Sequence, residues 1–254
     1  MNIIVCCKFV PCLQDMEVGP AKTVNFSKAQ WQISEYDLQA IEVGVQLAKK
    51  TGGKLTALSV GTSKIESTQL RKDLLSRGPD ALYLVVDDAL ENADTAQISG
   101  LLKNAVEKIG ADLVICGEGS ADLYYQQVGS QLGEKLDWIN FTNIDAVEVN
   151  DGELIVDRVL ENETEQLAVQ LPAVISVTSS INEPPRPNMR AILSAGKKPV
   201  TIWSPADVGA VDAVIDIKST LAPDSAERAG EILGGSVNEA AAEMARRLKA
   251  SGLL

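Results

Sequence analysis

Short apolar runs alternate with amphipathic segments over the first 140 residues, and this alternation constrains the fold more than any other feature of the chain. The runs span residues 2–7, 55–60, 81–86 and 111–116. Runs of this length, separated by segments of helical periodicity, are typical of buried strands joined by helices. The sequence therefore predicts an α/β fold with a three-layer, Rossmann-like parallel sheet that helices cover on both faces.

The predicted helices begin and end at recognisable residues. Ser34 or Asp37 is suited to cap a helix that runs to Lys50, and Asp94 to cap a helix that reaches Ile109. A third helix is expected over 64–76, where Gly78 and Pro79 follow its end. Ligands in parallel sheets bind beyond the carboxyl ends of the strands. We therefore expect Cys6, Lys8, Val60 and Gly117 to meet at one edge of the sheet.

The segment from Gly117 to Gly129 is the first candidate for a binding site. It follows a predicted buried strand, contains two glycines at 117 and 119, and leads into a predicted helix from Gln126 to Leu136. Glycine allows close backbone approach, and the start of a helix offers unpaired N–H groups and a partial positive charge to a phosphate. An ordinary turn between a strand and a helix would show the same local pattern, so both interpretations stay open here.

Composition excludes several classes of function. The net charge is −12 without a basic block, which argues against nucleic acid as a partner. The chain has no histidine, which excludes Ser-His-Asp and Cys-His catalysis and histidine metal sites. The four cysteines form no C-x-x-C motif and are predicted to be buried, reduced thiols. The apolar runs are too short to span a bilayer and no N-terminal signal pattern is present, so a cytoplasmic protein without membrane insertion is expected.

The pattern changes after Trp138. Strand-like segments at 143–149 and 153–159 flank Asn150-Asp151-Gly152, a hairpin signal, and further strands are expected at 165–171 and 173–177. These segments predict antiparallel additions followed by a return to the main sheet. The chain lacks the fingerprints of the classical dinucleotide fold, of P-loop NTPases and of the nucleophile elbow.

Regular periodicity is lost from Thr178 onward, where prolines punctuate the chain. We therefore predict a nucleotide domain over 1–180 and an extended C-terminal arm over 181–254. Lys197-Lys198 is expected to be solvated or to contact a partner. Ser236 and Glu239 form a capping box for one clear helix with the apolar stripe Val237, Ala241, Met244 and Leu248. That stripe needs a surface to cover it, either a partner chain or the chain's own domain.

Four segments that occur in order resemble the beta subunit of electron-transfer flavoproteins, and the resemblance covers nearly the whole chain. They are Val5-Cys6-Cys7-Lys8-x-Val10-Pro11; Gly117…Asp122…Gln126-Gln127-Val128-Gly129; Val156-x-Arg158-x-x-Glu161, followed by Glu165, Leu167 and Pro172-Ala173-Val174; and Ile181-Asn182-Glu183-Pro184, leading to Lys197-Lys198. The runs 71–80 and 195–199 look most like the Fix-type branch, which is linked to nitrogen fixation and anaerobic carnitine reduction.

The resemblance implies that the protein is an electron carrier rather than an enzyme and that it forms a heterodimer. It also implies that this chain folds into an adenine-nucleotide alpha-hydrolase-like domain. The alpha subunit holds the redox-active FAD, and this chain holds AMP or, in bifurcating members that use NADH, a second FAD. The C-terminal arm docks on the alpha subunit, and the electron partners are a dehydrogenase or a quinone- or ferredoxin-linked reductase. Carried over by position, the cofactor-binding residues are Cys6, Ser34, Asp37, Val60, Gly117, Asp122, Gln126, Gln127, Val128 and Gly129.

Two features depart from the family pattern. Asp122 is followed by Leu123-Tyr124-Tyr125, where bifurcating members often carry Asp-Gly-Asp-Thr, and the loop after Asn182 lacks the expected anchoring leucine. A stand-alone nucleotide-binding regulator of the stress-protein type is the alternative function. It accounts for the first 140 residues but leaves the arm and the terminal helix without a role.

Overall fold

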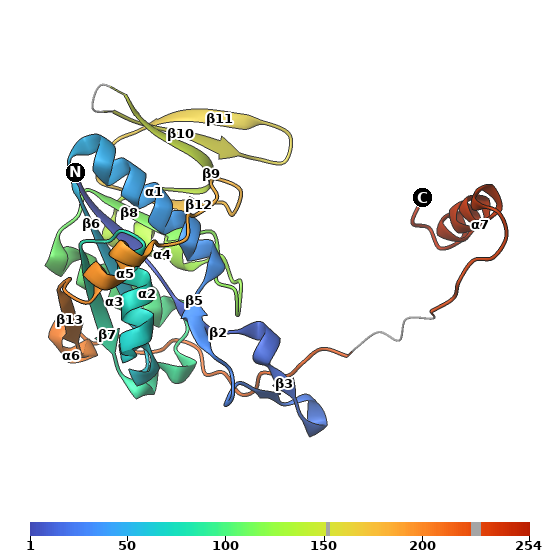
Figure 1. Cartoon of the computed structure of the whole chain (residues 1–254), viewed down its shortest axis with the longest axis horizontal. Helices are drawn as coiled ribbons and strands as arrows, with labels where there is room; N and C mark the ends of the chain where they lie inside the picture. Colours follow the sequence, from blue (N-terminus) through green and yellow to red (C-terminus); the bar gives the residue numbers. More distant parts are fainter. Residues whose placement is uncertain (151–152, 225–229) are drawn as a thin grey trace. The chain divides into compact units, whose positions relative to one another are not determined.

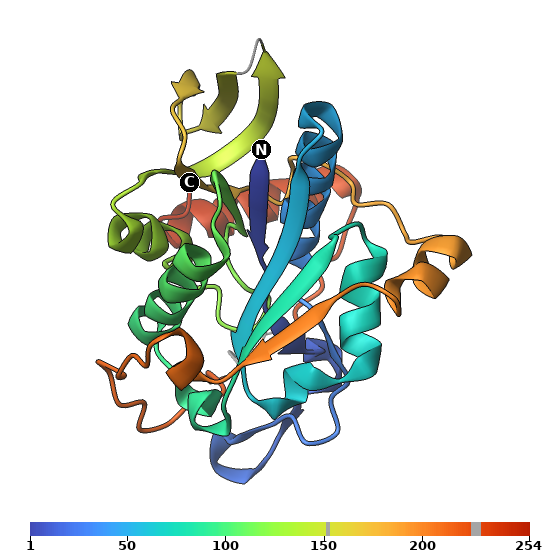
Figure 2. The same ribbon diagram turned by 90° about the vertical axis from the view of Figure 1, so that its left-hand side faces the viewer.

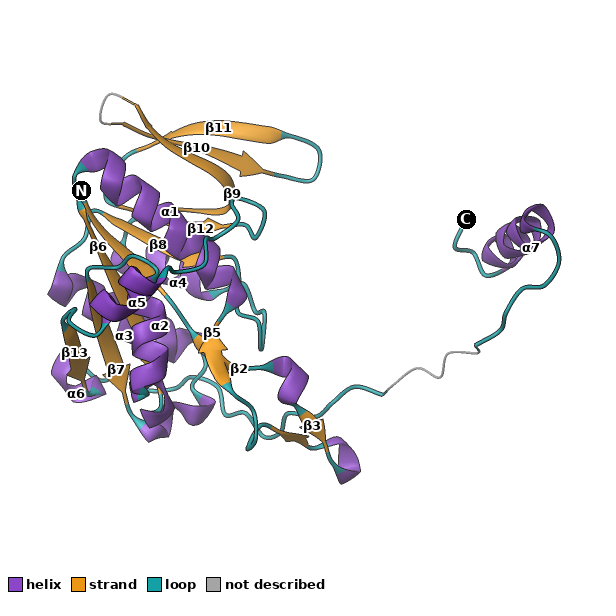
Figure 3. Ribbon diagram, viewed as in Figure 1, coloured by secondary structure: helices purple, strands orange, loops and turns teal. Residues whose placement is uncertain are grey.

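The computed structural model describes residues 1–150, 153–224 and 230–254. It divides into two compact units, Met1–Thr220 and Leu221–Leu254. The first unit is built on a nine-stranded sheet with the strand order β11-β10-β9-β12-β8-β1-β6-β7-β13. Figure 1 shows these elements along the chain, and Figure 3 separates the strands from the helices by colour.

The parallel part of the sheet confirms the predicted α/β fold. Its strands are β1 (Asn2–Cys6), β6 (Lys54–Gly61), β7 (Ala81–Val86), β8 (Leu113–Gly117), β12 (Ala173–Val177) and β13 (Val200–Trp203), and β9 (Ile139–Asn150) pairs parallel with β12. Strand β1 lies in the middle, paired with β6 on one side and β8 on the other. Its residues Ile3, Ile4 and Val5 are buried because helices cover both faces of the sheet.

Two layers of helices enclose the sheet, as the turned view in Figure 2 shows. One layer contains α1 (Glu35–Thr51), α2 (Thr68–Ser76) and α5 (Met189–Ala195), and the other contains α3 (Thr95–Ile109), α4 (Val128–Leu136) and α6 (Pro205–Val208). The neighbouring cysteines Cys6 and Cys7 point to opposite layers, as their positions in a strand predict. The buried apolar residues therefore form two cores, one on each face of the sheet.

The antiparallel additions predicted after Trp138 are present. Strand β9 pairs antiparallel with β10 (Glu153–Val159), which pairs with β11 (Thr164–Val169). Residues 151 and 152 of the predicted hairpin turn lie outside the described residues. A small excursion between β1 and α1 contains β2 (Phe9–Pro11), β3 (Glu17–Val18), β4 (Val24–Asn25) and β5 (Trp31–Ile33), which pair as β2 with β5 and β3 with β4.

Short 3-10 helices complete the first unit, at Leu13–Asp15, Pro20–Lys22, Ser63–Glu66 and Asp88–Asn92. The helix predicted over 64–76 is shorter in the structure. The chain makes the 3-10 turn Ser63–Glu66 first, and α2 begins only at Thr68. The cap predicted at Asp94 is present, and its carboxylate accepts from Gln97 N at 2.7 Å. Helix α1 ends at Gly52, which has a left-handed conformation. Ser34 is the N-cap residue of α1, although its side chain makes no capping hydrogen bond.

Regular elements continue after Thr178, where the sequence loses its periodicity. Strand β13 joins the edge of the main sheet parallel to β7, and α5 packs against α2. Lys198, expected to be solvated or to contact a partner, donates to the carbonyls of Leu75, Gly78 and Pro79 at 2.9, 3.2 and 2.6 Å. The first compact unit accordingly ends later than the boundary predicted after residue 180.

The second unit contains α7 (Val237–Ala250), which begins with the predicted capping box of Ser236 and Glu239. None of its residues is buried, and Val237 is 86% exposed at the start of the apolar stripe. In the described part of the chain, no helix combines the length and the hydropathy that a bilayer crossing requires.

Candidate functional site

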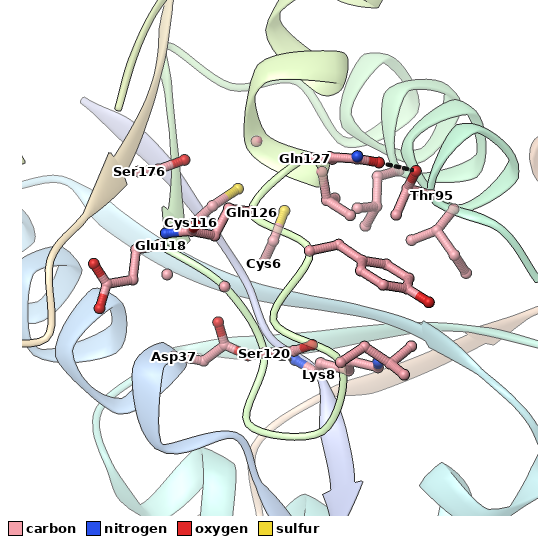
Figure 4. A pocket seen from close by; sticks show the side chains of 18 of the residues that line it. Cys6, Lys8, Asp37, Thr95, Cys116, Glu118, Ser120, Gln126, Gln127 and Ser176 are labelled. Carbon is pink, nitrogen blue, oxygen red and sulfur yellow. Dashed lines mark hydrogen bonds between the residues drawn. The ribbon is translucent and has the colours of Figure 1, made fainter. Parts of the chain in front are cut away.

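A pocket opens beyond the carboxyl ends of the central strands, where the sequence places the candidate site. Figure 4 shows its side chains. Eight of the predicted cofactor-binding residues line it: Cys6, Asp37, Val60, Gly117, Gln126, Gln127, Val128 and Gly129. The other two, Ser34 and Asp122, are not among the residues that line the pocket.

The wall of the pocket includes the start of α4. This helix has no side-chain cap: Gln127 is its N-cap residue and makes no capping hydrogen bond. Val128 and Gly129, the first two residues of the helix, both line the pocket. The N–H groups of the first turn are thus available to a ligand, and the helix dipole favours an anion at this position.

Gly129 lets α4 approach the sheet closely. A Cβ atom at this position would lie 2.1 Å from Oγ of Ser176 and 3.6 Å from Cβ of Cys116. Any larger residue would therefore push the start of the helix away from β8 and β12 and would change the shape of the pocket.

Gln127 is oriented by a neighbouring helix. Its Oε1 accepts a hydrogen bond from the hydroxyl of Thr95 at 2.9 Å, which Figure 4 shows as a dashed line. An amide that accepts through its oxygen keeps its NH₂ group as a donor. The side chain thus adds a neutral donor beside the uncapped start of α4.

Asp37 lies in the first turn of α1 and connects this helix to the ends of β1 and β8 beside the pocket. Asp37 is 6% exposed, and its carboxylate accepts from the backbone N–H of Lys8 at 2.7 Å, just beyond β1. The backbone of Gly117 at the end of β8 also donates to it. Burial raises the pKa of Asp37 to about 7, and these two hydrogen bonds and the charge of Lys8 only partly oppose it.

Gly117 fits against this carboxylate because it has no side chain. A Cβ atom there would lie 2.7 Å from Oδ1 of Asp37 and 2.7 Å from the carbonyl oxygen of Tyr36. The glycine at the end of β8 is therefore needed for the contact with α1, which forms one side of the pocket.

Ser34 and Asp122 hold the loop that follows β8. The hydroxyl of Ser34 accepts from the backbone N–H of Ala121 at 3.2 Å, and the side chain of Ser34 is fully buried. Asp122 accepts from Nζ of Lys8 at 2.6 Å. Burial acts to raise the pKa of Asp122, but the charge and the hydrogen bond of Lys8 outweigh it and hold that pKa below its usual range.

The floor of the pocket is largely apolar and carries two thiols. Val60, Ile98 and Leu102 line it together with Cys6 and Cys116, whose sulfur atoms point into the pocket in Figure 4. The hydrogen bond of the Cys6 thiol with Cys116 and then burial raise the pKa of Cys6 well above its usual value, so this thiol stays protonated. Three of the four free cysteines are buried as predicted, whereas Cys12 is only half buried.

Several residues of the pocket were not predicted from the sequence: Ala93, Thr95, Ile98, Leu102, Cys116 and Ser176. Cys116 and Ser176 stand at the ends of predicted strands, so the rule that placed Cys6 and Val60 at the carboxyl edge would have found them as well. Thr95, Ile98 and Leu102 face the pocket from α3, and the local sequence carries no signal for that contact.

A comparison with protein families relates this geometry to known proteins. A family model described as the electron transfer flavoprotein domain matches residues 22–208, well over half of the chain. The chain belongs to the electron transfer flavoprotein family. Members of the electron transfer flavoprotein family bind flavin and act as electron carriers rather than as classical enzymes. The matched range includes the segments of the pocket that come from α1, β6, α3, β8, α4 and β12, while Cys6 and Lys8 precede it.

Proposed function

We propose that this chain is the beta subunit of a heterodimeric electron transfer flavoprotein and that its pocket holds an adenine nucleotide. The observation that carries the proposal is the uncapped start of α4 facing a pocket with an apolar floor. A phosphate suits the helix start, and a flat apolar base suits the floor.

The polar wall supplies the groups that would hold the phosphate. These are the first-turn N–H groups at Val128 and Gly129 and the side-chain amide of Gln127, which Thr95 orients. The base would lie toward Val60, Ile98 and Leu102. The nucleotide is AMP or the adenine half of a second FAD.

Electron transfer itself belongs to the flavin, which the alpha subunit holds in this proposal. The role of this chain is to bind and orient. Asp37 and Gly117 fix the edge of the sheet against α1, and Lys8 with Asp122 fixes the loop beyond β8. The electron partners are a dehydrogenase or a quinone- or ferredoxin-linked reductase. The Fix-type branch and the cytoplasmic location remain predictions.

The second unit supports the heterodimer. Helix α7 buries none of its residues, and Val237 and Met244 of its apolar stripe are 86% and 49% exposed. An apolar stripe of this kind is stabilised by covering it with another surface. We propose that the alpha subunit covers it, and that the docking arm is the unit Leu221–Leu254. The alternative, a stand-alone regulator of the stress-protein type, would give this stripe no role.

Co-expression of the chain with the candidate alpha subunit from its genomic neighbourhood tests this proposal. We expect a yellow heterodimer that contains an adenine nucleotide in addition to the flavin of the alpha subunit. Truncation after Thr220 should abolish the heterodimer and leave nucleotide binding intact, because the first unit stays whole. Replacement of both Val237 and Met244 by Asp should act like the truncation, whereas Ala242→Asp on another face of α7 is the matched control. A truncated chain that still forms the heterodimer would contradict the docking arm.

A further inference from the structure

The loop from Ser120 to Gln127 contains two side-chain-bearing residues in the left-handed backbone region. Tyr124 has φ 49° and Gln126 has φ 57°, and they flank Tyr125. This region is unfavourable for residues with a Cβ atom. Such residues persist only where the surrounding structure fixes them, and they cluster at binding sites.

Contacts on both sides fix this loop. On one side, the ring of Tyr124 packs on that of Tyr36 with centroids 5.0 Å apart and an interplanar angle of 40°. The backbone N–H of Tyr124 donates to Ser120 O at 2.9 Å. On the other side, Gln127 is held by the hydroxyl of Thr95 at 2.9 Å. The backbone on either side of Tyr125 is therefore set before any ligand arrives.

Tyr125 itself is held by its backbone alone. It lines the pocket, yet it is 52% exposed. Within residues 1–150, 153–224 and 230–254, no hydrogen bond or ring contact of Tyr125 is found. Tyr124 next to it is 43% exposed as well, but its ring packs against the ring of Tyr36, whereas the ring of Tyr125 has no such neighbour among the described residues. An aromatic ring presented at a pocket in this way is suited to cover another flat ring.

We propose that Tyr125 is a specificity-determining residue that stacks on a planar ring of the bound nucleotide. This inference rests on the proposed function, because it concerns the same pocket. The ring that it covers is the adenine of a mononucleotide or the isoalloxazine of a dinucleotide, and both present the same flat π face. Replacement of the Tyr125 ring should weaken the binding of ligands that carry the matching planar ring. It should not affect the binding of ligands that carry only the sugar phosphate.

The test compares Tyr125→Ala with Tyr125→Phe in the full-length chain freed of nucleotide. Calorimetric titration with AMP, FAD and ribose 5-phosphate measures each dissociation constant. We expect Tyr125→Ala to weaken the binding of AMP or FAD by about 5- to 150-fold, the range for loss of one stacked base. Tyr125→Phe should stay within about 2-fold of the wild type because it keeps the ring. Weaker binding of AMP would identify adenine as the ring that Tyr125 covers. Weaker binding of FAD with unchanged binding of AMP would identify isoalloxazine.

Three results would overturn the inference. The first is binding of AMP and FAD by Tyr125→Ala with wild-type affinity. The second is an equal loss in Tyr125→Ala and Tyr125→Phe, which would assign the effect to the hydroxyl. The third is an equal loss for ribose 5-phosphate, which would show a general change of the pocket. Tyr125→Leu, with an apolar side chain but no ring, should behave like Tyr125→Ala and guards against misfolding of the smaller variant. A wild-type chain that binds neither AMP nor FAD would refute the proposed function itself.

Discussion

Nζ of Lys8 lies 2.6 Å from Oδ2 of Asp122 and connects two segments that are 114 residues apart in the sequence. Lys8 follows β1 and Asp122 stands in the loop after β8. The two strands are hydrogen-bonded neighbours in the sheet, so the ion pair extends their pairing beyond the end of the sheet. It joins the end of the central strand to the loop that carries Tyr125 and leads into α4.

Replacement of Lys8 by Met should loosen this loop without unfolding the protein. The side chain of Lys8 is 42% exposed, so the global free energy of unfolding should fall by no more than about 1 kcal/mol. The amide hydrogens of 121–126 should exchange faster, as mass spectrometry can measure, because the loop loses one of its anchors. Lys28→Met, which breaks the exposed ion pair with Glu17, is the control and should leave that exchange unchanged. Equal exchange in both variants would contradict the anchoring role.

Asp37 should make the stability of the protein depend on pH. Its pKa is raised to about 7 in the folded chain, above its unfolded value, so its stabilising contribution is greatest in acid and is lost as the pH rises to about 7. Between pH 5 and 7 the wild type should lose about 2 kcal/mol of unfolding free energy relative to Asp37→Asn. Urea titrations at pH 5, 6, 7 and 8 measure this difference. Parallel curves for both proteins would show that Asp37 does not titrate in this range.

Replacement of Gly129 by Ala should destabilise the fold and distort the pocket together. The new Cβ atom would lie 2.1 Å from Oγ of Ser176, so we expect a loss of about 1–3 kcal/mol. Ser176→Ala removes that oxygen and leaves Cβ at 3.5 Å, an ordinary contact. The double variant should therefore recover most of the stability and of the nucleotide affinity lost by Gly129→Ala alone. Additive losses in the double-mutant cycle would disprove the steric cause.

Lys198→Met should destabilise the edge of the sheet. The ammonium group donates to three backbone carbonyls at the end of α2 and just beyond it. Its removal leaves those carbonyls without their charged donor, so we expect a loss of about 2 kcal/mol in thermal or chemical unfolding. Lys197→Met changes the same charge one residue away and should have little effect. Equal losses in the two variants would indicate a general charge effect.

The sequence was informative wherever a local pattern determines structure. The strands β7, β10 and β12 occupy the residues predicted for them, because a buried strand and its flanking turns are encoded within a few residues. The same holds for the cap at Asp94 and the capping box at Ser236. The order of the strands and helices alone was enough to predict that the pocket lies at the carboxyl edge of the sheet.

Long-range contacts account for what was not predicted. β13 is a four-residue edge strand between Pro199 and Pro205, too short for a periodic signal, and only its pairing with β7 defines it. Ser34 and Asp122 are predicted to bind the cofactor, and this stays a prediction; in the structure they do not line the pocket and hydrogen-bond to Ala121 and Lys8. The local sequence around a polar residue near a site is the same whether the residue contacts the ligand or holds a loop in place.

The identity and amount of nucleotide released from the purified protein test the central claim most directly. The full-length chain, purified together with its alpha subunit, would be denatured and its small molecules identified by mass spectrometry and quantified against protein. We predict one adenine nucleotide per copy of this chain, as AMP or as FAD, beyond the flavin of the alpha subunit, and markedly less in Gly129→Ala. A heterodimer that is fully folded and yellow but contains no second nucleotide would contradict the account.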